Sequence, residues 1–436
     1  MRWNRQFLLI AYLFLIPYFS FSRIAAQERF EATVIDAQSH AQLPFASVYV
    51  DQGTSTITNA EGTFVINCQP SDVLRISYVG YKTALIAASQ LNNVVMLQPQ
   101  ETMLQGVTVV PIGPLIDRIT KETLRTMRKY KNRKADFYYR QTAFSDSTCY
   151  EFAESFLTGC PVTSLRDLHL HTGRYAALES DSINSYYMFG NFYTFSQIEV
   201  ANIYAMPSRS NDIVPLFRNY DKFYDVSYWV INEDGNRVFV LEFEPKADRG
   251  SYAKWPILAA SIYVDEKSLR IRRIEGRGIN SWISVSRKID IFRTRRRIMP
   301  TNFTFHVEFS DNQKYPEVQS VYIEEKHDID GHMNTTHSLL FNLGGDNADE
   351  SKATKHSLFQ RIGKYLKEQY RPTQKGDALN YNTQLHNSIA RQGYDPEFWD
   401  RNEIVRRTPI EEKVLELFKQ KNLFGVMGVQ KEENEE

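Results

Sequence analysis

Alternation of apolar and polar residues with a period of two is the pattern that most constrains this chain. The alternation is most regular in FTFHVEF, residues 303–309. In a β-strand, residues two positions apart point to the same face, so the apolar residues share one face and the polar residues the other. The apolar row of that stretch consists of Phe303, Phe305, Val307 and Phe309. Two longer stretches, VSYWVINEDGNRVFVLEF and SVYIEEKHDIDGHMNTTHSLLF, each carry a central Asp-Gly pair typical of a hairpin turn. Sequential hairpins of half-polar strands predict an antiparallel sheet with one buried and one wetter face.

Shorter strands separated by turn residues fill residues 30–97. Apolar runs such as TFVINC and VLRISYV alternate with Gly, Asn and Asp at the points where the chain must reverse. This even spacing predicts a small antiparallel β-sandwich.

The run from VIDAQSHAQLPFASVYVDQGTSTITNAEGTFVINC to LRISYVGYKTALI resembles the carboxypeptidase-regulatory-like domain, a transthyretin-like Greek-key sandwich. The similarity is to the version that precedes many exported proteins of Gram-negative bacteria. The matching positions include Asp36, Leu43, Pro44, Gly62, Phe64, Gly80 and Tyr81. Asn59 and Ala41 depart from the pattern at turns, and neither departure would disturb the fold. The following segments are similar to the second domain of uncharacterised exported proteins that begin with this sandwich.

The first residues have the form of a secretory signal peptide. Arg2 and Arg5 precede an apolar run over residues 7–21, and Ala25-Ala26 provides a small-residue cleavage site. We expect cleavage near Ala26 and a mature protein in the periplasm or at the periphery of the outer membrane; retention of the segment as an anchor is the alternative.

The whole chain is predicted to be mainly β with helical additions. Its expected parts are a signal peptide (1–26), the regulatory-like sandwich (27–100), a linker with an amphipathic helix (101–134), an antiparallel β domain forming a curved sheet or half-barrel (135–345), and a helical tail with a disordered end (346–436). The 52 basic and 52 acidic residues balance, which argues against a nucleic-acid partner.

The helix predicted over residues 114–131 has an apolar stripe containing Ile116 and Ile119 and a basic stripe opposite. A basic amphipathic helix can lie on an anionic membrane, which would give peripheral membrane contact. The alternative is a helix docked on its own domain with a solvated cationic face.

No catalytic, cofactor or metal motif is found. The zinc carboxypeptidases associated with this sandwich hold their metal with a His followed three residues later by Glu, and no histidine here has that partner; HExxH, GxSxG and P-loop patterns are also absent. His327, His332 and His337 are regularly spaced, but a turn at Asp330-Gly331 would put His337 on the opposite face from the other two, which excludes a three-ligand zinc site. We therefore expect a protein that is not an enzyme and has no cofactor.

Arginines cluster in RIRRIEGRG and FRTRRRIMP. If these strands were neighbours, the arginines would form a cationic strip able to bind phosphate or carboxylate groups, whereas a solvated face balanced by nearby glutamates is the alternative. The strip would consist of Arg270, Arg272, Arg273, Arg277, Arg293, Arg295, Arg296 and Arg297.

Two further pairs are testable against a structure. Glu151 and Glu154 are three residues apart in an expected strand, so they should face opposite sides, and an inward Glu154 would pair with Arg140 as a buried ion pair. Cys149 and Cys160 are candidates for a disulfide in an oxidising compartment.

The function expected first is a non-enzymatic exported binding protein that uses the sandwich as a scaffold and interacts with an envelope protein, glycan or lipid. The alternative is a periplasmic carrier of a lipid or other hydrophobic ligand, with the apolar row Phe303, Phe305, Val307 and Phe309 lining a half-barrel. A hydrolase without a recognised motif is a third hypothesis.

Overall fold

The computed structural model describes most of the two predicted β regions and parts of the tail. The described residues are 27–50, 54–78, 80–100, 112–130, 133–160, 169–178, 216, 220–233, 235–254, 257–285, 296–310, 317–329, 331–344, 377–378, 388–389 and 394–424. The predicted signal segment, residues 1–26, lies outside them, as do Arg293 and Arg295.

Residues 28–97 form two small sheets around one core. The strands are β1 (Glu28–Asp36), β2 (Ser47–Val50), β3 (Ser55–Ile57), β4 (Thr63–Cys68), β5 (Val73–Ser77), β6 (Ala84–Ala87) and β7 (Val94–Leu97). They are ordered β4-β1-β7 and β3-β2-β5-β6, and every pair is antiparallel except β1 with β7. Val34, Phe64 and Ile76 are among the fully buried side chains of the shared core. The predicted sandwich is confirmed.

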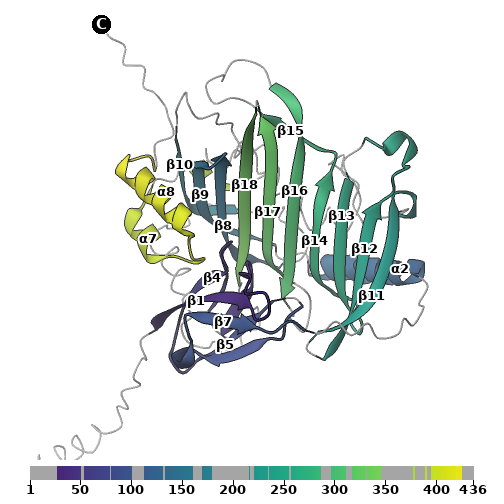
Figure 1. Cartoon of the computed structure of the whole chain (residues 1–436), viewed down its shortest axis with the longest axis horizontal. Helices are drawn as coiled ribbons and strands as arrows, with labels where there is room; N and C mark the ends of the chain where they lie inside the picture. The colour runs from purple at the N-terminus through teal and green to yellow at the C-terminus, as the bar shows by residue number, and fades with distance from the viewer. Residues whose placement is uncertain are drawn as a thin grey trace, which may run out of the picture.

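A second, much larger sheet of twelve antiparallel strands follows (Figure 1). Its strands are β8 (Ala135–Ser145), β9 (Thr148–Gly159), β10 (His169–Ala177), β11 (Tyr224–Glu233), β12 (Asn236–Pro245), β13 (Ile257–Asp265), β14 (Ile271–Ile279), β15 (Ser281–Val285), β16 (Arg296–Ser310), β17 (Glu317–Ile329), β18 (His332–Gly344) and β19 (Asp377–Ala378). The order is β11-β12-β13-β14-β16-β17-β18-β8-β9-β10-β19, with β15 beside β16. Both predicted Asp-Gly hairpins are confirmed, since they join β11 to β12 and β17 to β18.

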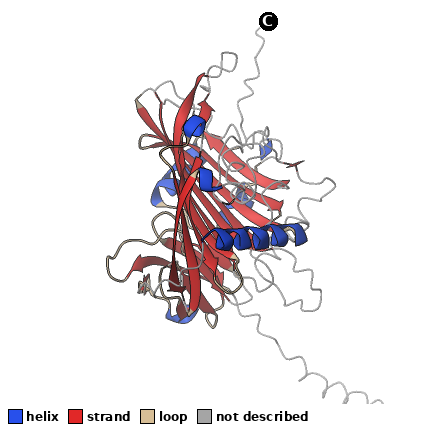
Figure 2. Ribbon diagram, turned by 90° about the vertical axis from the view of Figure 1, so that its right-hand side faces the viewer, coloured by secondary structure: helices blue, strands red, loops and turns tan. Residues whose placement is uncertain are grey.

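The sheet has two differently covered faces, which we call inner and outer. Helix α2 (Ile112–Lys129) lies across the inner face (Figure 2), where Leu115, Ile116 and Ile119 join the main core of the sheet. The exposed side of α2 carries basic residues, namely Arg118, Lys121 and Arg125. The apolar stripe is therefore docked on its own domain, and membrane contact through the basic side stays a prediction.

The C-terminal segment covers part of the outer face. Helices α7 (Pro396–Arg401) and α8 (Pro409–Gln420) begin at Asp395 and Thr408, whose side chains accept hydrogen bonds from backbone N–H groups of the first turn. Thr408 forms a complete capping box, which is why α8 starts sharply after its proline. Phe398 and Trp399 are buried and pack against Phe156 of β9. These aromatic residues attach the tail to the sheet.

The sandwich lies on the same outer face and contacts both the sheet and the tail. Phe45 stacks on Tyr322 of β17 with ring centroids 3.9 Å apart. The hydroxyl of Thr56 donates a hydrogen bond of 2.8 Å to the carbonyl of Ile404, and Arg29 forms an ion pair of 2.9 Å with Glu403. The tail thus lies between sandwich and sheet and contacts both.

The cysteines do not form the expected disulfide. Cys149 lies near the start of β9 and Cys160 just beyond its end, so about 35 Å of extended strand separates them. Both thiols are buried, as is that of Cys68, and none of the three forms a disulfide. Two cysteines at opposite ends of one straight strand cannot meet, so this prediction is wrong.

Candidate functional site

The predicted apolar row lies on the inner face. Phe303, Phe305 and Val307 belong to its core, and Phe309 packs against it half-buried. The two inner phenyl rings lie directly over glycines of β14: a Cβ atom on Gly278 would be 2.2 Å from Cε1 of Phe303. Because the glycines leave room for the rings, the row packs closely against β14 as a buried apolar surface within the main core.

A polar region, which we call the inner-face polar patch, adjoins this apolar surface. It occupies neighbouring positions of β17, β18, β8 and β9 on the same face. The patch consists of Gln141, Ser145, Glu151, Glu325, His327, Asn334, Thr336 and Ser338. All eight are buried, His327 being 1% exposed and Asn334 0%. Such a concentration of buried polar side chains is informative, because buried polar groups normally need hydrogen-bond partners.

Some polar atoms of the patch have no hydrogen-bond partner among the described residues. These atoms are both ring nitrogens of His327, Oδ1 of Asn334 and Oγ1 of Thr336. The amide nitrogen of Asn334 donates a hydrogen bond of 3.1 Å to the carbonyl of His332, so the side-chain oxygen is the atom of Asn334 that still needs a partner. Burial lowers the pKa of His327 to about 4, which keeps the imidazole neutral at pH 7. Unpartnered buried polar atoms cost free energy, and a ligand could supply their missing partners.

Glu151 and Glu154 face opposite sides of the sheet, as their spacing predicted. Glu151 is on the inner face, where it accepts a hydrogen bond of 2.9 Å from the hydroxyl of Tyr175. Glu154 is on the outer face and pairs with Arg140 at 2.9 Å and with Arg174 at 2.5 Å. The two carboxyl groups cannot cooperate in acid–base chemistry across a sheet.

The predicted ion pair of Glu154 and Arg140 is part of a larger buried cluster under the tail. Arg407 of the tail lies 3.6 Å from Glu154, and Arg140 donates at 2.7 Å to the backbone carbonyl of Val405. Burial favours the neutral acid, but the arginines outweigh it and hold the pKa of Glu154 well below its usual range. The guanidinium of Arg174 also lies 4.9 Å from the ring centre of Trp399. The cluster joins sheet to tail, which is a structural role.

The described arginines of the predicted cationic strip fall into two groups that lie apart. Arg277 of β14 pairs with Thr304 of β16, whereas Arg296 lies eight residues before Thr304, about 26 Å away along the strand. Arg297 follows Arg296 at the same end of β16. Arg270 lies just before the start of β14.

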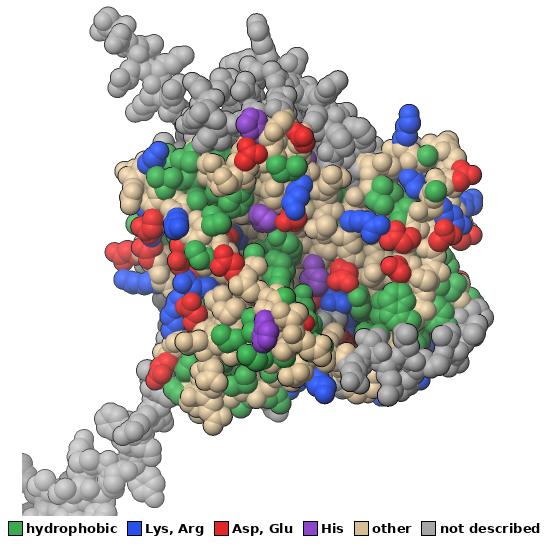
Figure 3. All heavy atoms as spheres, viewed as in Figure 1, with side chains coloured by type: hydrophobic (Ala, Val, Ile, Leu, Met, Phe, Trp, Pro, Cys, Tyr) green, Lys and Arg blue, Asp and Glu red, His purple; other side chains and the backbone are tan. Residues whose placement is uncertain are grey.

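The arginines of β14 lie next to acidic groups. The ion pairs are Arg272 with Glu233 at 3.3 Å, Arg273 with Glu275 at 3.8 Å and Arg277 with Glu244 at 2.9 Å. Basic and acidic side chains are correspondingly interspersed over the surface in Figure 3. This arrangement favours the balanced face over an anion-binding strip.

The histidine register of the second hairpin is confirmed. Ile329 pairs with His332 and His327 with Asn334, so His337 points to the other face. Within the part of the chain that the structure describes, no group of three or more His, Cys, Asp or Glu side chains could hold a metal ion.

His306 on the outer face gives a pH-dependent prediction. It lies 2.9 Å from Glu308 and 3.7 Å from Glu275, beside Arg273 and across from Tyr322. Burial opposes its charge, but the two carboxylates outweigh this effect and raise its pKa to about 9. A raised pKa adds stability that is complete below about pH 6.5 and is lost as the pH rises through about 9.

We therefore expect the melting temperature of the protein to fall between pH 6.5 and pH 9, and the fall to be smaller in His306→Gln. Differential scanning fluorimetry across this range measures it, with the exposed-histidine variant His332→Gln as the control. Identical pH profiles for His306→Gln and the native chain would contradict the assignment.

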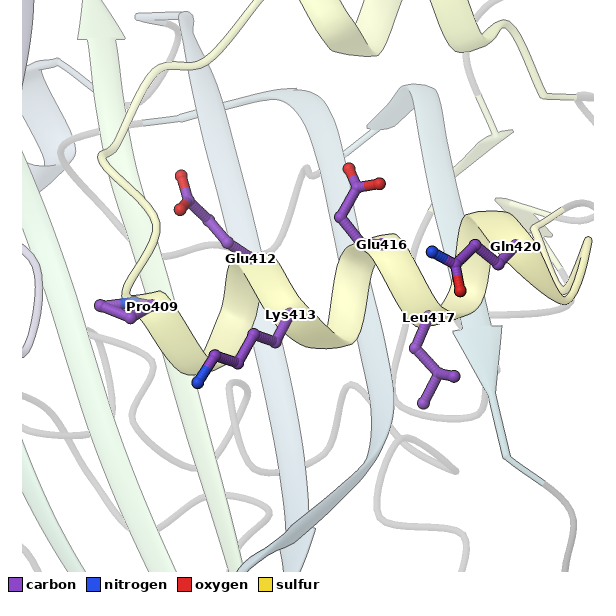
Figure 4. A pocket seen from close by; sticks show the side chains of 6 residues that line it. All are labelled: Pro409, Glu412, Lys413, Glu416, Leu417 and Gln420. Atoms are coloured by element: carbon purple, nitrogen blue, oxygen red, sulfur yellow. The ribbon is translucent and has the colours of Figure 1, made fainter.

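One surface hollow lies along α8 (Figure 4). Its lining residues are Pro409, Glu412, Lys413, Glu416, Leu417 and Gln420. All six come from a single helix, so no groups converge on it from different elements, and we do not assign it a function. Among the described helices, none combines the length and apolar character needed to span a bilayer.

Sequence comparison agrees with the N-terminal fold. Residues 31–109 match the family model of the CarboxypepD_reg-like domain, which confirms the resemblance of the sandwich. The chain matches none of the curated proteins.

Solved structures give weaker likenesses. A LolA superfamily protein from Nitrosomonas europaea is 9% identical, with 51% of this chain and 92% of that chain covered and a TM-score of 0.19. A DUF1329 family protein from Desulfovibrio piger is 12% identical (53% and 95% covered, TM-score 0.19). A protein from Bacteroides fragilis described as membrane-associated and of unknown function is 11% identical (73% and 98% covered, TM-score 0.14). Such low scores carry no argument about function.

Sequence reasoning missed the inner-face polar patch. Its signal is the period-two row Asn334, Thr336 and Ser338 in NTTHSLL, which is indistinguishable from a solvated strand face until the neighbouring strands are known.

Proposed function

We propose that this protein is a non-catalytic, exported binding protein that holds an amphiphilic ligand, an apolar chain with a polar headgroup, against the inner face of its large sheet. The observation that carries the proposal is that the buried apolar row of β16 adjoins a buried polar patch in which atoms of His327, Asn334 and Thr336 have no hydrogen-bond partner among the described residues. Export is supported by the signal-like sequence of residues 1–26.

The apolar surface provides the place for the chain of the ligand. Phe303, Phe305 and Val307 form a row on β16, and the apolar surface continues over β14 and β13 through Ile274 and Ile262. Burying a methylene group contributes about 0.8 kcal/mol, so a surface of this kind binds more tightly as the chain of the ligand lengthens.

The polar patch provides the place for the headgroup. It lies beside the apolar row because Phe303 pairs with Glu325 and Phe305 with Ile323 on the next strand. A ligand spanning this boundary would bury its apolar part and hydrogen-bond its polar part at once. Neither ring nitrogen of His327 makes a hydrogen bond to a hydroxyl group among the described residues, so no nucleophile is activated here, which favours binding over catalysis.

The test is amphiphile binding by the full chain purified from the periplasm without detergent. Organic extraction followed by mass spectrometry should recover a bound amphiphile. The protein stripped of it should bind dodecyl glycosides roughly 100-fold more tightly than octyl glycosides, because four methylene groups are involved. An empty extract, together with no dodecyl or octyl binding by calorimetry, would show that the proposal is wrong.

A further inference from the structure

We infer that the inner-face polar patch selects an uncharged, hydroxyl-rich headgroup, such as the sugar of a glycolipid, over a phosphate or ammonium headgroup. This inference rests on the proposed function and adds the chemical class of the ligand. It is carried by three side chains on two adjacent strands, His327, Asn334 and Thr336.

The three side chains form a compact group. His327 is directly opposite Asn334 across the β17–β18 pair, which places their Cβ atoms about 5 Å apart. Thr336 follows two residues further along β18 on the same face, opposite Glu325. A single sugar-sized group could therefore reach all three side chains.

Hydrogen-bond chemistry decides which headgroup satisfies them. The oxygen of Asn334 needs a donor, and the neutral imidazole of His327 offers one N–H donor and one acceptor nitrogen. A phosphate that is fully ionised only accepts and an alkylammonium at most donates, so each would leave at least one buried atom unsatisfied. Hydroxyl groups both donate and accept, so a polyol can satisfy all of them.

The neighbouring acid favours the same choice. The carboxylate of Glu325 lies opposite Thr336 and is 3.9 Å from the imidazole of His327. A carboxylate accepts hydrogen bonds from hydroxyl groups and repels an anionic headgroup in a buried site.

The experiment compares dodecyl β-glucoside, dodecyl phosphate and dodecyltrimethylammonium below their micelle concentrations, using the stripped full chain and calorimetry. We expect the dissociation constant of the glucoside to be at least tenfold lower than those of the two charged amphiphiles. The double variant Asn334→Leu/Thr336→Val should reduce this preference to less than about threefold, the effect of losing one or two hydrogen bonds.

The matched control is Thr335→Val on the outer face of the same strand, which should keep the full preference. The single variant Thr336→Val should lose part of the preference while its melting temperature stays the same or rises by up to about 2 °C, because it removes an unpartnered buried hydroxyl. If the double variant does not fold, the headgroup preference of Thr336→Val alone tests the inference.

Equal binding of all three amphiphiles, or an unchanged preference in Thr336→Val, would overturn the headgroup inference and leave the proposed function standing. Binding of none of them, with no amphiphile in the periplasmic extract, would overturn the proposed function itself and the headgroup inference with it.

Discussion

Replacing Glu154 by Gln is expected to lower the free energy of unfolding by about 3–5 kcal/mol, the usual cost of removing one partner from a buried ion pair. Glu154 is completely buried, and Arg140, Arg174 and Arg407 approach it within 4 Å. The amide of Gln would fit the space, but it would leave buried guanidinium groups without their countercharge. Denaturant unfolding monitored by tryptophan fluorescence measures the change.

The loss should be greatest where the tail contacts the sheet. Arg140 donates to Val405, and Arg174 lies beside Trp399, so both arginines connect β8 and β10 to the tail. We expect limited proteolysis within the tail segment 394–424 to become faster in the variant. Loss of stability without increased cleavage there would show that the cluster stabilises the sheet alone.

The effect of Glu154 should also depend on pH. Because its folded pKa is held below the ordinary value of 4.5, its contribution is present above about pH 4.5 and is lost as the pH falls towards the folded pKa. The difference between the native chain and Glu154→Gln should therefore shrink in acid. The control is Glu397→Gln: that carboxylate pairs with Arg401 on the surface, both side chains being 77% exposed, so the change should be within about 1 kcal/mol.

Replacing Gly278 by Ala is expected to destabilise the protein by about 1–3 kcal/mol, through overpacking of the inner face. The added Cβ atom would lie 2.2 Å from Cε1 of Phe303, whose ring is buried and cannot swing into solvent. Either the ring or strand β14 must move, and both belong to the main core. Chemical denaturation again provides the measurement.

A double-mutant cycle tests the stated cause. Phe303→Ala removes the clashing ring, so the cost of Gly278→Ala should be small when it is introduced into that variant. Gly113→Ala is the matched control, because the nearest atom to its Cβ would be 3.8 Å away and alanine suits a helix better than glycine. Strictly additive effects of the Gly278 and Phe303 substitutions would show that the loss of stability in Gly278→Ala does not come from the contact with the Phe303 ring.

Local pattern was sufficient to predict several elements. The sandwich followed from short strands with turn residues, and the hairpin register at His327 followed from the Asp-Gly turn, since both depend on residues close together in the chain. The opposite orientation of Glu151 and Glu154 followed from the period of a strand. Helix α8 starts at Pro409 behind a capping box of Thr408 and Glu411, which is a local signal of the same kind.

Pairings between distant segments could not be predicted in the same way. The arginine strip required the arginine-rich parts of β14 and β16 to lie side by side, whereas the register of that pair shifts them apart. The disulfide required Cys149 and Cys160 to approach each other, but they are at opposite ends of one strand. Both hypotheses assumed a spatial arrangement that the spacing of residues along the chain does not contain.

The sequence by itself determined which segments are strands, which of their residues share a face, and the nature of the N-terminal sandwich, because these depend on local periodicity and turn chemistry. Only the tertiary structure decided that β18 lies beside β8, and this pairing puts Asn334 and Thr336 next to Ser145 and Ala143 on a buried surface. A row of polar residues on one strand face has the same sequence pattern whether it faces water or a binding site, because its burial depends on which other segments cover it.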